Sequence, residues 1–208
     1  MDSRYIIIGI GALSLLFLFP RKRDEGEIVE PSLEYLQAQG PVSKREAARV
    51  MEYRTPLMQF GAQHGFEAAV IAALVSAESA GKWDATGDGG KAIGLTQIHY
   101  ATARDIGFQG DKADLFNPVT NIGWGTRYLR WQFDRYGGRS LAHALSAYQA
   151  GHVEVLADSG QYRNQWYIDR VAQRIPFFRR LMMWYYPGYA TAQNVTYELG
   201  GIPRCCGR

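Results

Sequence analysis

Residues 66–81 read FEAAVIAALVSAESAG and decide the fold of this chain. The segment is almost wholly apolar from residue 66 to residue 77, and Gly81 soon breaks the pattern. An apolar run of this length is too long for an ordinary strand, so it predicts a helix over residues 66–79. One carboxylate, Glu78, stands close to the end of that helix.

Glu78 lies on the apolar side of the predicted helix, because helical spacing puts Ile71, Leu74 and Val75 on the same face. An ionised carboxylate is costly to bury. Glu78 therefore either faces a cleft or stays protonated because its pKa is raised. A glutamate with a raised pKa is what a general acid needs near neutral pH. Taken alone, the pattern is more typical of a helix-end carboxylate turned to solvent.

The rest of the chain is expected to be mainly α-helical. Few stretches alternate with a period of two, which argues against a large sheet. A further helix is expected to start after Ser43, which caps it with Glu46 three residues on, and to run towards Phe60. Other helices are expected over residues 117–136, 140–150 and 165–180, the last interrupted by Pro176. Residues 61–65 are expected to form a turn, residues 83–91 a loop, and residues 94–104 a turn that becomes helical near Ala101.

The N-terminus predicts a membrane anchor. Residues 5–19 read YIIIGIGALSLLFLF and are followed by Pro20 and the basic cluster of residues 21–23. As a helix this run is about 22 Å long, short of a hydrocarbon core of about 30 Å, although the flanking residues can extend it. No small-residue cleavage site follows, so we expect a retained anchor and not a cleaved signal peptide.

The expected organisation has four parts. An anchor covers residues 1–23, a juxtamembrane linker residues 24–45, a catalytic domain residues 46–187 and a tail residues 188–208. Two adjacent cysteines in that tail are too few and too close for a metal site, and no cofactor is expected. The formal charge of +3 comes without a dense basic stripe, so we do not expect nucleic acid as a partner.

Four segments line up in order along the chain. They are Glu78-Ser79, Gly94-Leu95-Thr96-Gln97-Ile98, Asn117-Pro118 leading to Asn121-Ile122-Gly123, and Ala147-Tyr148-Gln149-Ala150-Gly151. The ordered set resembles the lysozyme-like soluble lytic transglycosylase family. Tyr167-Ile168 with Val171 resembles the late Tyr-Val helix of that family, so the resemblance spans about residues 66–171.

The resemblance implies a lysozyme-like α-helical fold and cleavage of peptidoglycan glycan strands. Glu78 would act first as acid and then as base, because the nucleophile in this family is the 6-hydroxyl of the same muramyl sugar. Ser79, Gly94, Gln97, Tyr148 and Tyr167 would bind substrate. Gly94 would let the backbone approach the glycan, Gln97 would supply an amide, and the Tyr148 phenol would bind substrate or Glu78.

Ordinary explanations also exist for the flanking residues. The segment around Gly94 is equally typical of a turn entering a helix, and Tyr148 of a packing aromatic. Helix capping explains Asn117 and Asn121 better than catalysis does. A further set of aromatics is expected to belong mostly to the core, although sugar rings stack on such faces: Trp83, Tyr100, Trp124 and Trp131.

The chain departs from the family pattern at Thr96, where methionine is usual, and at Gln149, where asparagine is usual. Residues 78–82 also resemble goose-type lysozymes, which hydrolyse the same bond. Those enzymes carry an acidic residue where Asp88 stands here, and a second one where this chain has His99. Asp88 is therefore a possible second carboxylate, although a turn residue in a glycine-rich loop explains it as well.

The expected function is thus a membrane-anchored lytic transglycosylase that leaves 1,6-anhydro-muramyl ends. The alternatives are a muramidase that uses Glu78 with an Asp88-positioned water, and a non-catalytic glycan-binding structural protein. The basic residues follow the anchor, which would keep the domain on the cytoplasmic side of a cell membrane. A membrane inside a phage virion removes that conflict, so we expect a virion membrane or a bacterial cell envelope, with virion or envelope-complex proteins as possible partners.

Overall fold

The computed structural model describes residues 41–138, 140–186 and 188–189. The expected anchor, nearly all of the expected linker and all but two residues of the expected tail lie outside these residues. Within the described part of the chain, no helix combines the length and the apolar composition needed to span a membrane. The prediction of an anchor therefore concerns residues of which the structure says nothing.

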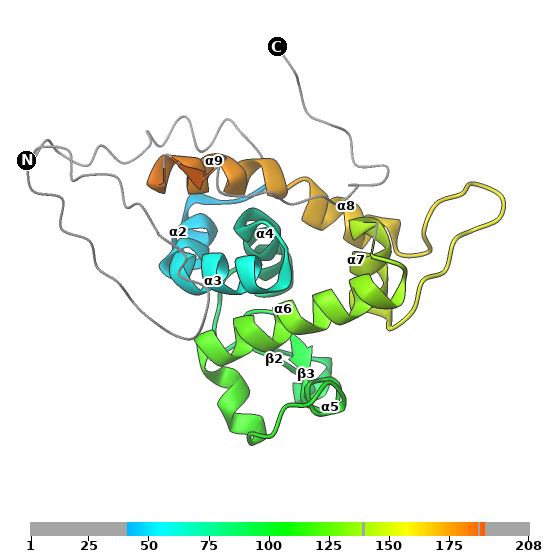
Figure 1. Ribbon diagram of the computed structural model, residues 1–208, viewed down its shortest axis with the longest axis horizontal. Coiled ribbons are helices and arrows are strands. Elements are labelled where there is room, and N and C mark those ends of the chain that lie inside the picture. Colours follow the sequence, from blue (N-terminus) through cyan, green and yellow to red (C-terminus); the bar gives the residue numbers. More distant parts are fainter. Residues whose placement is uncertain (1–40, 139, 187, 190–208) are drawn as a thin grey trace, which may run out of the picture. The chain divides into compact units, whose positions relative to one another are not determined.

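The described part is mainly α-helical, as expected (Figure 1). The helices in chain order are α2 (Lys44–Glu52), α3 (Arg54–His64), α4 (Ala68–Ser79), α5 (Tyr100–Asp105), α6 (Pro118–Arg135), α7 (Leu141–Ala150), α8 (Gln165–Ala172) and α9 (Ile175–Tyr185). Two short 3-10 helices are η1 (Asp88–Gly90) and η2 (Lys112–Phe116). The strands are β1 (Thr86–Gly87), β2 (Ala92–Ile93) and β3 (Ile98–His99).

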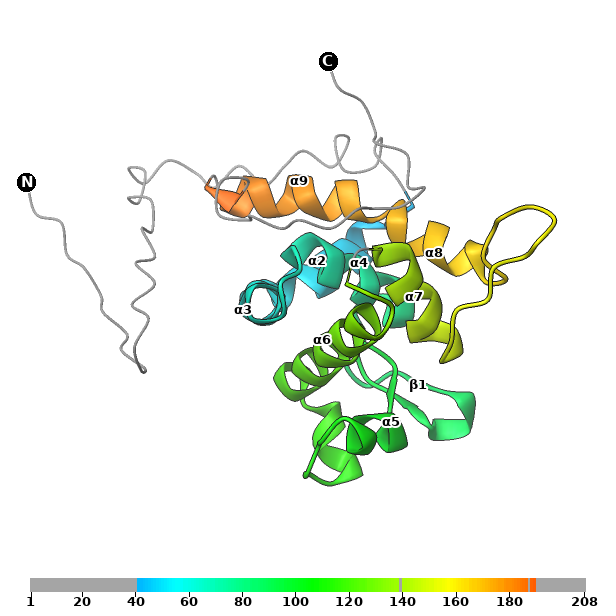
Figure 2. The same cartoon turned by 45° about the vertical axis from the view of Figure 1, so that its right-hand side comes forward.

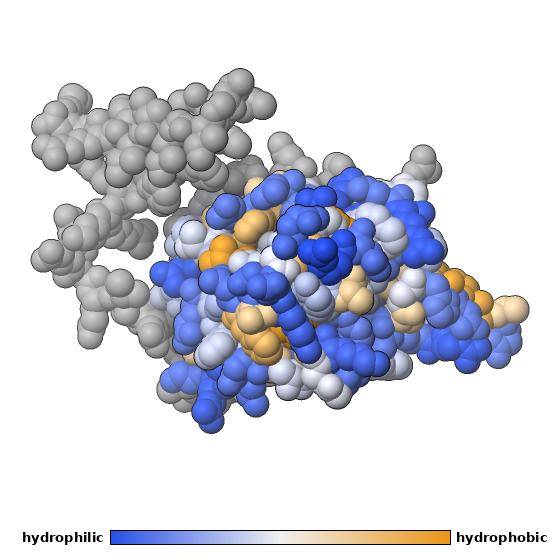
Figure 3. All heavy atoms as spheres, turned by 90° about the horizontal axis from the view of Figure 1, so that it is seen from below, coloured by the Kyte–Doolittle hydropathy of each residue, from blue (hydrophilic) through white to orange (hydrophobic). Residues whose placement is uncertain are grey.

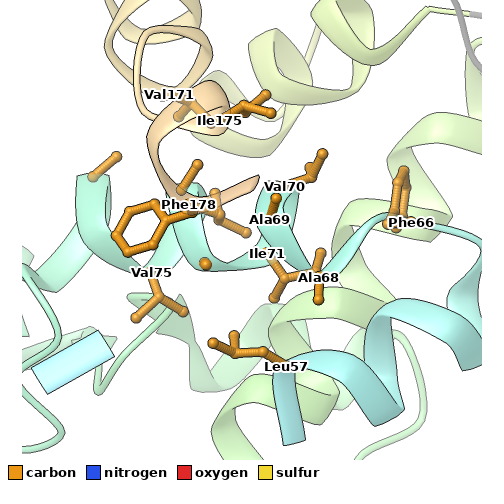
Figure 4. Packing of buried hydrophobic residues seen from close by; sticks show 14 of the residues in the cluster. Leu57, Phe66, Ala68, Ala69, Val70, Ile71, Val75, Val171, Ile175 and Phe178 are labelled. Carbon is orange, nitrogen blue, oxygen red and sulfur yellow. The ribbon is translucent and has the colours of Figure 1, made fainter. Parts of the chain in front are cut away.

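Helix α4 forms the centre of the larger core. Its residues from Ala68 to Ala77 are all buried, because its sequence is apolar on every side. Helices α2, α3, α8 and α9 pack around it, and α6 crosses beside it (Figures 1 and 2). Figure 4 shows Leu57 of α3 and Phe178 of α9 on different sides of α4, and both side chains are fully buried. The predicted helix over residues 66–79 is confirmed as the element that organises the fold.

A smaller core lies beneath the three strands and α5. It consists of Ile93, Ile98, Ala103, Phe108 and Leu115. The strands pair antiparallel in the order β1-β2-β3. Each strand has only two residues, which is too short to show an alternating pattern in the sequence. The sheet was therefore not predictable from periodicity.

Helix α6 joins the two cores. Ile122, Leu129 and Phe133 pack into the larger core, as their spacing predicts. Trp124 and Tyr128 pack against the smaller core. The residues that pack into the two cores therefore lie on one helix of 18 residues. The side chain of Asn117 caps the start of this helix by accepting hydrogen bonds from the amides of its first turn.

The expected start is confirmed, because the side chain of Ser43 caps α2 by accepting a hydrogen bond from the backbone nitrogen of Glu46. The expected single helix towards Phe60 is wrong, because two helices meet at Tyr53. Pro56 lacks an amide hydrogen and cannot continue a helix through this point, but it is tolerated in the first turn of α3. The expected turn over residues 61–65 is also wrong, since α3 runs to His64 and only Gly65 adopts the left-handed conformation. Gly61 stays helical, and a Cβ there would come 2.8 Å from the carbonyl oxygen of Phe66.

The helix expected over residues 165–180 is interrupted, as predicted. The break falls between Ala172 and Ile175, so that Pro176 lies in the first turn of α9, where no amide hydrogen is needed. Helix α9 then packs along α4, and Tyr189 after it is buried as well.

Candidate active site

Glu78 occupies the last turn of α4, one residue before the helix ends. The chain then turns through Ala80 and Gly81, which have φ angles of 52° and 75°. Gly81 is required here, because a Cβ would lie 2.9 Å from both the Cβ of Arg49 and the backbone nitrogen of Val50. The central helix therefore stops abruptly and leaves its terminal carboxylate partly buried and not enclosed in the core.

Tyr167 is the direct partner of Glu78. Its hydroxyl donates a hydrogen bond to Oε1 of Glu78 from α8, 89 residues away in the sequence. The Tyr167 ring is buried, and burial raises its pKa well above the usual value, so the phenol stays a donor at neutral pH. Tyr167 thus holds the carboxylate of Glu78 in one orientation. The sequence predicted Tyr167 as a substrate-binding residue and did not predict this positioning role.

Burial is the main influence on the charge of Glu78 and raises its pKa to about 7. The hydrogen bond from Tyr167 and the charge of Arg170 lower that pKa, whereas the charge of Asp88 raises it. A carboxyl group with this pKa is partly protonated near neutral pH and can exchange its proton with a reacting oxygen. This is the property that the sequence predicted for a carboxylate on the apolar face of a helix.

Tyr148, on α7, lies beside Glu78 and Tyr167. Burial raises the pKa of Tyr148 well above the usual value, and the charge of Glu78 raises that pKa further. Its hydroxyl donates to the carbonyl oxygen of Thr96 at 2.9 Å. The phenol of Tyr148 was predicted to bond Glu78 or substrate. The hydrogen bond to Glu78 comes from Tyr167 instead. A bond from Tyr148 to substrate stays a prediction. Tyr148 instead fastens the segment around Thr96 to α7.

Gln97 adopts a φ of 49°, which is uncommon for a residue with a Cβ. Its side-chain nitrogen donates to the carbonyl oxygens of Ala85 at 3.1 Å and Gly94 at 2.8 Å. Both bonds thus stabilise the loop that contains Gln97 and tie it to the segment around Ala85. An amide offered to a sugar, as the resemblance implies, would have to be released from these bonds or act through the side-chain oxygen.

Asn121 is the residue that links this loop to α6. It is fully buried, and its oxygen accepts hydrogen bonds from the backbone nitrogen of Thr96 at 2.8 Å and the hydroxyl of Thr96 at 2.7 Å. Its nitrogen donates to the carbonyl oxygens of Ile93 and Leu115. The expectation of helix capping is right for Asn117 and wrong for Asn121. No feature of the sequence near Asn121 distinguished the two roles.

Gly94 and Ser79 serve the same loop. Gly94 has a φ of 70°, and a Cβ there would lie 2.5 Å from the side-chain nitrogen of Asn121. Ser79 donates from its hydroxyl to the carbonyl oxygen of Leu95 at 2.9 Å. The structure therefore gives both residues a role in packing the loop against α4 and α6, and the approach of a glycan to Gly94 stays a prediction.

The two departures from the family pattern are accommodated by local contacts. Thr96 is fully buried against Gly125, where any Cβ would lie 2.3 Å from the Thr96 hydroxyl. The side-chain oxygen of Gln149 accepts a hydrogen bond from Asn164 at 2.8 Å. Asn164 directly precedes α8, so this bond helps to fix the helix that carries Tyr167.

Asp88 lies in η1 and is bound to His99. Nε2 of His99 is 3.0 Å from Oδ2 of Asp88, and both side chains are exposed. The strand pairs Gly87–Ala92 and Ala92–His99 bring the two residues together across the sheet. Asp88 is near enough for its charge to act on Glu78. Among the described residues, no group of three His, Cys, Asp or Glu side chains is arranged to hold a metal ion.

The expected assignment of four aromatics to the core holds only in part. Trp83 and Trp131 are 51% and 46% exposed, so this expectation is wrong for both. Trp124 packs on Phe108, and Tyr100 on the same ring. Trp83 begins the glycine-rich loop over residues 83–91, which agrees with its exposure, whereas Trp131 lies on the same helix as the packed Trp124.

Comparison with known proteins places this site in a family. Residues 57–169, more than half of the chain, match the model of the transglycosylase SLT domain, and the chain belongs to that family. A curated relative, the "Transglycosylase" of Enterobacteria phage PRD1, is 36% identical over 90 residues, which are 43% of this chain and 31% of that protein. The chain thus spans about a third of the length of that relative.

Solved structures show the same fold. The 70-kDa soluble lytic transglycosylase of Escherichia coli matches with a TM-score of 0.53 at 20% identity, over 78% of this chain and 28% of that one. An inactive mutant of the lytic transglycosylase Slt from Pseudomonas aeruginosa matches with a TM-score of 0.50 at 21% identity, over 72% and 25%. The mainly helical lysozyme-like fold predicted from the sequence is confirmed.

Proposed function

We propose that the protein is a peptidoglycan lytic transglycosylase with Glu78 as its acid and base. Membership of the transglycosylase SLT domain family supports the reaction class. The observation that carries the proposal is a carboxylate at the end of the central helix, held by Tyr167, with a pKa raised to about 7. The Pseudomonas aeruginosa relative carries a Glu-to-Gln substitution and is described as inactive.

The reaction requires one carboxylate that acts twice. Protonated Glu78 gives its proton to the oxygen of the β-1,4 bond between MurNAc and GlcNAc, and this bond breaks. The 6-hydroxyl of the same muramyl sugar then attacks the anomeric carbon, and Glu78 takes up the hydroxyl proton. The products are a 1,6-anhydro-muramyl end and a free GlcNAc hydroxyl, and Glu78 regains its proton. The intramolecular attack gains from proximity.

A comparison of Glu78→Gln with the unaltered protein tests this proposal. The substitution keeps an oxygen for the Tyr167 hydroxyl but removes the proton that the reaction needs. We expect Glu78→Gln to stay folded and to clear no zone in a gel containing sacculi. A clear zone from the variant would overturn the assignment of Glu78.

The second candidate is hydrolysis of the same bond, favoured by the position of Asp88. Its charge acts on Glu78, and its bond to His99 fixes its orientation. In that reaction an Asp88-positioned water would replace the 6-hydroxyl as nucleophile. Reducing ends in the digest, lost with Asp88→Asn, would establish it. Binding of sacculi without any cleavage would instead support a non-catalytic structural protein.

The biological setting is a separate proposal, which rests on the apolar segment over residues 5–19. We infer that the chain is held in a virion membrane or a bacterial envelope and opens the cell wall locally. The phage origin of one relative agrees with a virion. Protease treatment of intact particles should leave the domain uncut until the membrane is dissolved. Cleavage in intact particles would contradict an internal position.

A further inference from the structure

A row of aromatic rings leads from the site to the surface. The ring of Tyr148 lies 5.0 Å from that of Tyr128, measured between centroids. Tyr128 is in turn nearly parallel to Trp131, with an interplanar angle of 16° and 6.1 Å between centroids. Tyr148 is only 8% exposed, whereas Trp131 is 46% exposed. The row therefore begins beside Glu78 and ends in solvent.

The hydroxyl of Tyr128 has a defined direction because of Gln132. The fully buried Gln132 places its side-chain nitrogen 3.1 Å from the carbonyl oxygen of Ala147, which only accepts hydrogen bonds. The same nitrogen donates to the Tyr128 hydroxyl at 2.7 Å. The Tyr128 hydroxyl is thus an acceptor in this bond, and no hydrogen bond of the described residues uses its own hydrogen. The oxygen of Gln132 is buried and has no partner among the described residues.

Arg135 adds a positive charge at the outer end of the row. Its guanidinium carbon lies 5.2 Å from the centroid of the Trp131 ring, within the range of a cation–π contact. One of its nitrogens donates to the carbonyl oxygen of Gly151, just after α7. The charge is therefore held next to the aromatic row while the side chain remains exposed.

We propose that Tyr128, Trp131 and Arg135 extend the glycan-binding site and hold a further sugar of the strand. Tyr128 and Arg135 flank the Trp131 ring, and its exposed part offers apolar surface to a pyranose ring. The free hydrogen of Tyr128 would bond a hydroxyl or acetamido oxygen of that sugar, and Arg135 would pair with a carboxylate of its peptide stem. The ligand is an amino-sugar polymer with acidic stems. This inference rests on the proposed function.

Trp184 provides a matched control. It is 37% exposed on α9, a value close to that of Trp131, and its ring packs edge-on against Tyr185. Among the ring contacts of the described residues, none links Trp184 to Tyr148 or Tyr128. If exposure alone decided glycan binding, Trp131→Ala and Trp184→Ala would lower the affinity equally. A larger loss for Trp131→Ala therefore reports on the aromatic row.

Binding is measured by calorimetry with soluble glycan strands that retain their peptide stems, in the Glu78→Gln protein so that no cleavage occurs. We expect Trp131→Ala to weaken binding about tenfold, as for a central aromatic contact, and Trp131→Phe to restore most of the affinity. Trp184→Ala should bind like its parent. Equal affinities for Trp131→Ala and Trp184→Ala would overturn the inference.

Arg135→Gln gives a second test that does not depend on the folding of a tryptophan variant. It should weaken binding of strands with peptide stems several-fold and leave strands stripped of their stems unaffected. An equal effect on both strands, or none, would overturn the role of Arg135.

The inference and the proposed function can fail separately. If the unaltered protein cleaves sacculi while all variants bind alike, the inference fails alone. If the parent neither binds nor cleaves, the proposed function fails with it.

Discussion

At the scale of the residue, the environment of Glu78 sets the protonation state of its carboxyl group. The same side chain in solvent would be ionised at neutral pH. Burial at the end of α4 raises its pKa, and the Tyr167 hydroxyl partly opposes that effect. The helix of apolar residues and the phenol from α8 together give one glutamate a proton that it can both give and take.

Activity should fall as the pH rises through about 7, because Glu78 must be protonated to act as acid. Tyr167→Phe removes a hydrogen bond that lowers this pKa, so the alkaline limb should move to higher pH. Turnover should fall on the order of tenfold, because the carboxylate is held less firmly. Rates of sacculus lysis from pH 5 to pH 9 measure both effects. Tyr148→Phe is the control, and an equal shift in that variant would contradict the role of Tyr167.

The stability of the fold should also report on Glu78. Its pKa is higher in the folded state than in the unfolded chain, so the folded state binds the proton more tightly. The full stability is present below about pH 4.5, and it is lost as the pH rises to about 7, by about 3 kcal/mol at most. Glu78→Gln should therefore be the more stable protein at pH 8 and nearly equal at pH 4.5. Urea unfolding at both pH values measures this, and a constant difference would contradict it.

At the scale of the element, the loop over residues 92–98 is fixed by side chains from its neighbours. The backbone of Thr96 is bonded on both sides, because its nitrogen donates to Asn121 of α6 and its carbonyl oxygen accepts from Tyr148 of α7. The carbonyl oxygen of Leu95 accepts from Ser79 of α4. The three small strands alone are too short to hold the loop. Side chains from three helices thus hold this loop in place.

Asn121→Ala should destabilise the protein far more than Asn117→Ala. The first change leaves buried groups of Thr96, Ile93 and Leu115 without a partner, at a cost of about 3 kcal/mol or more. The second removes an exposed helix cap, worth about 1 kcal/mol. The free energy of unfolding in urea compares the two variants. Similar losses would show that Asn121 is not the link between the loop and α6.

Most of the helices, and the position of a carboxylate at the end of the central one, were predictable because both depend on patterns that are local in the sequence. The apolar run before Glu78 and the cap at Asn117 belong to this kind. The contacts between distant segments were not predictable in the same way. The bond from Tyr167 to Glu78 spans 89 residues, and the role of Asn121 depends on a loop 25 residues before it. Exposure of Trp131 likewise depends on how α6 packs.

At the scale of the molecule, the central helix α4 is held at its start by residues far along the chain. The hydroxyl of Tyr189 accepts a hydrogen bond from the backbone nitrogen of Ala69 at 2.9 Å, and Arg179 binds Glu67 just before α4. Near its other end, Ser76 bonds Glu46 and Arg174 in a cluster that is mostly buried. These contacts connect α2, α4 and α9 into one support for Glu78.

Tyr189→Phe should lower the free energy of unfolding by about 1 kcal/mol, because it leaves the first turn of α4 with an unpaired buried amide. Tyr185→Phe, at an exposed position on α9, should have almost no effect. Thermal unfolding of the two variants side by side measures the difference. Equal melting temperatures would show that the C-terminal part of the described chain does not hold helix α4.

Mass spectrometry of sacculi digested by the unaltered protein and by Glu78→Gln tests the proposed reaction most directly. We expect muropeptides with 1,6-anhydro-muramyl ends from the unaltered protein and no soluble products from the variant. Reducing ends in their place would contradict the intramolecular attack. Release of anhydro-muropeptides by Glu78→Gln would contradict the central claim that Glu78 supplies the proton.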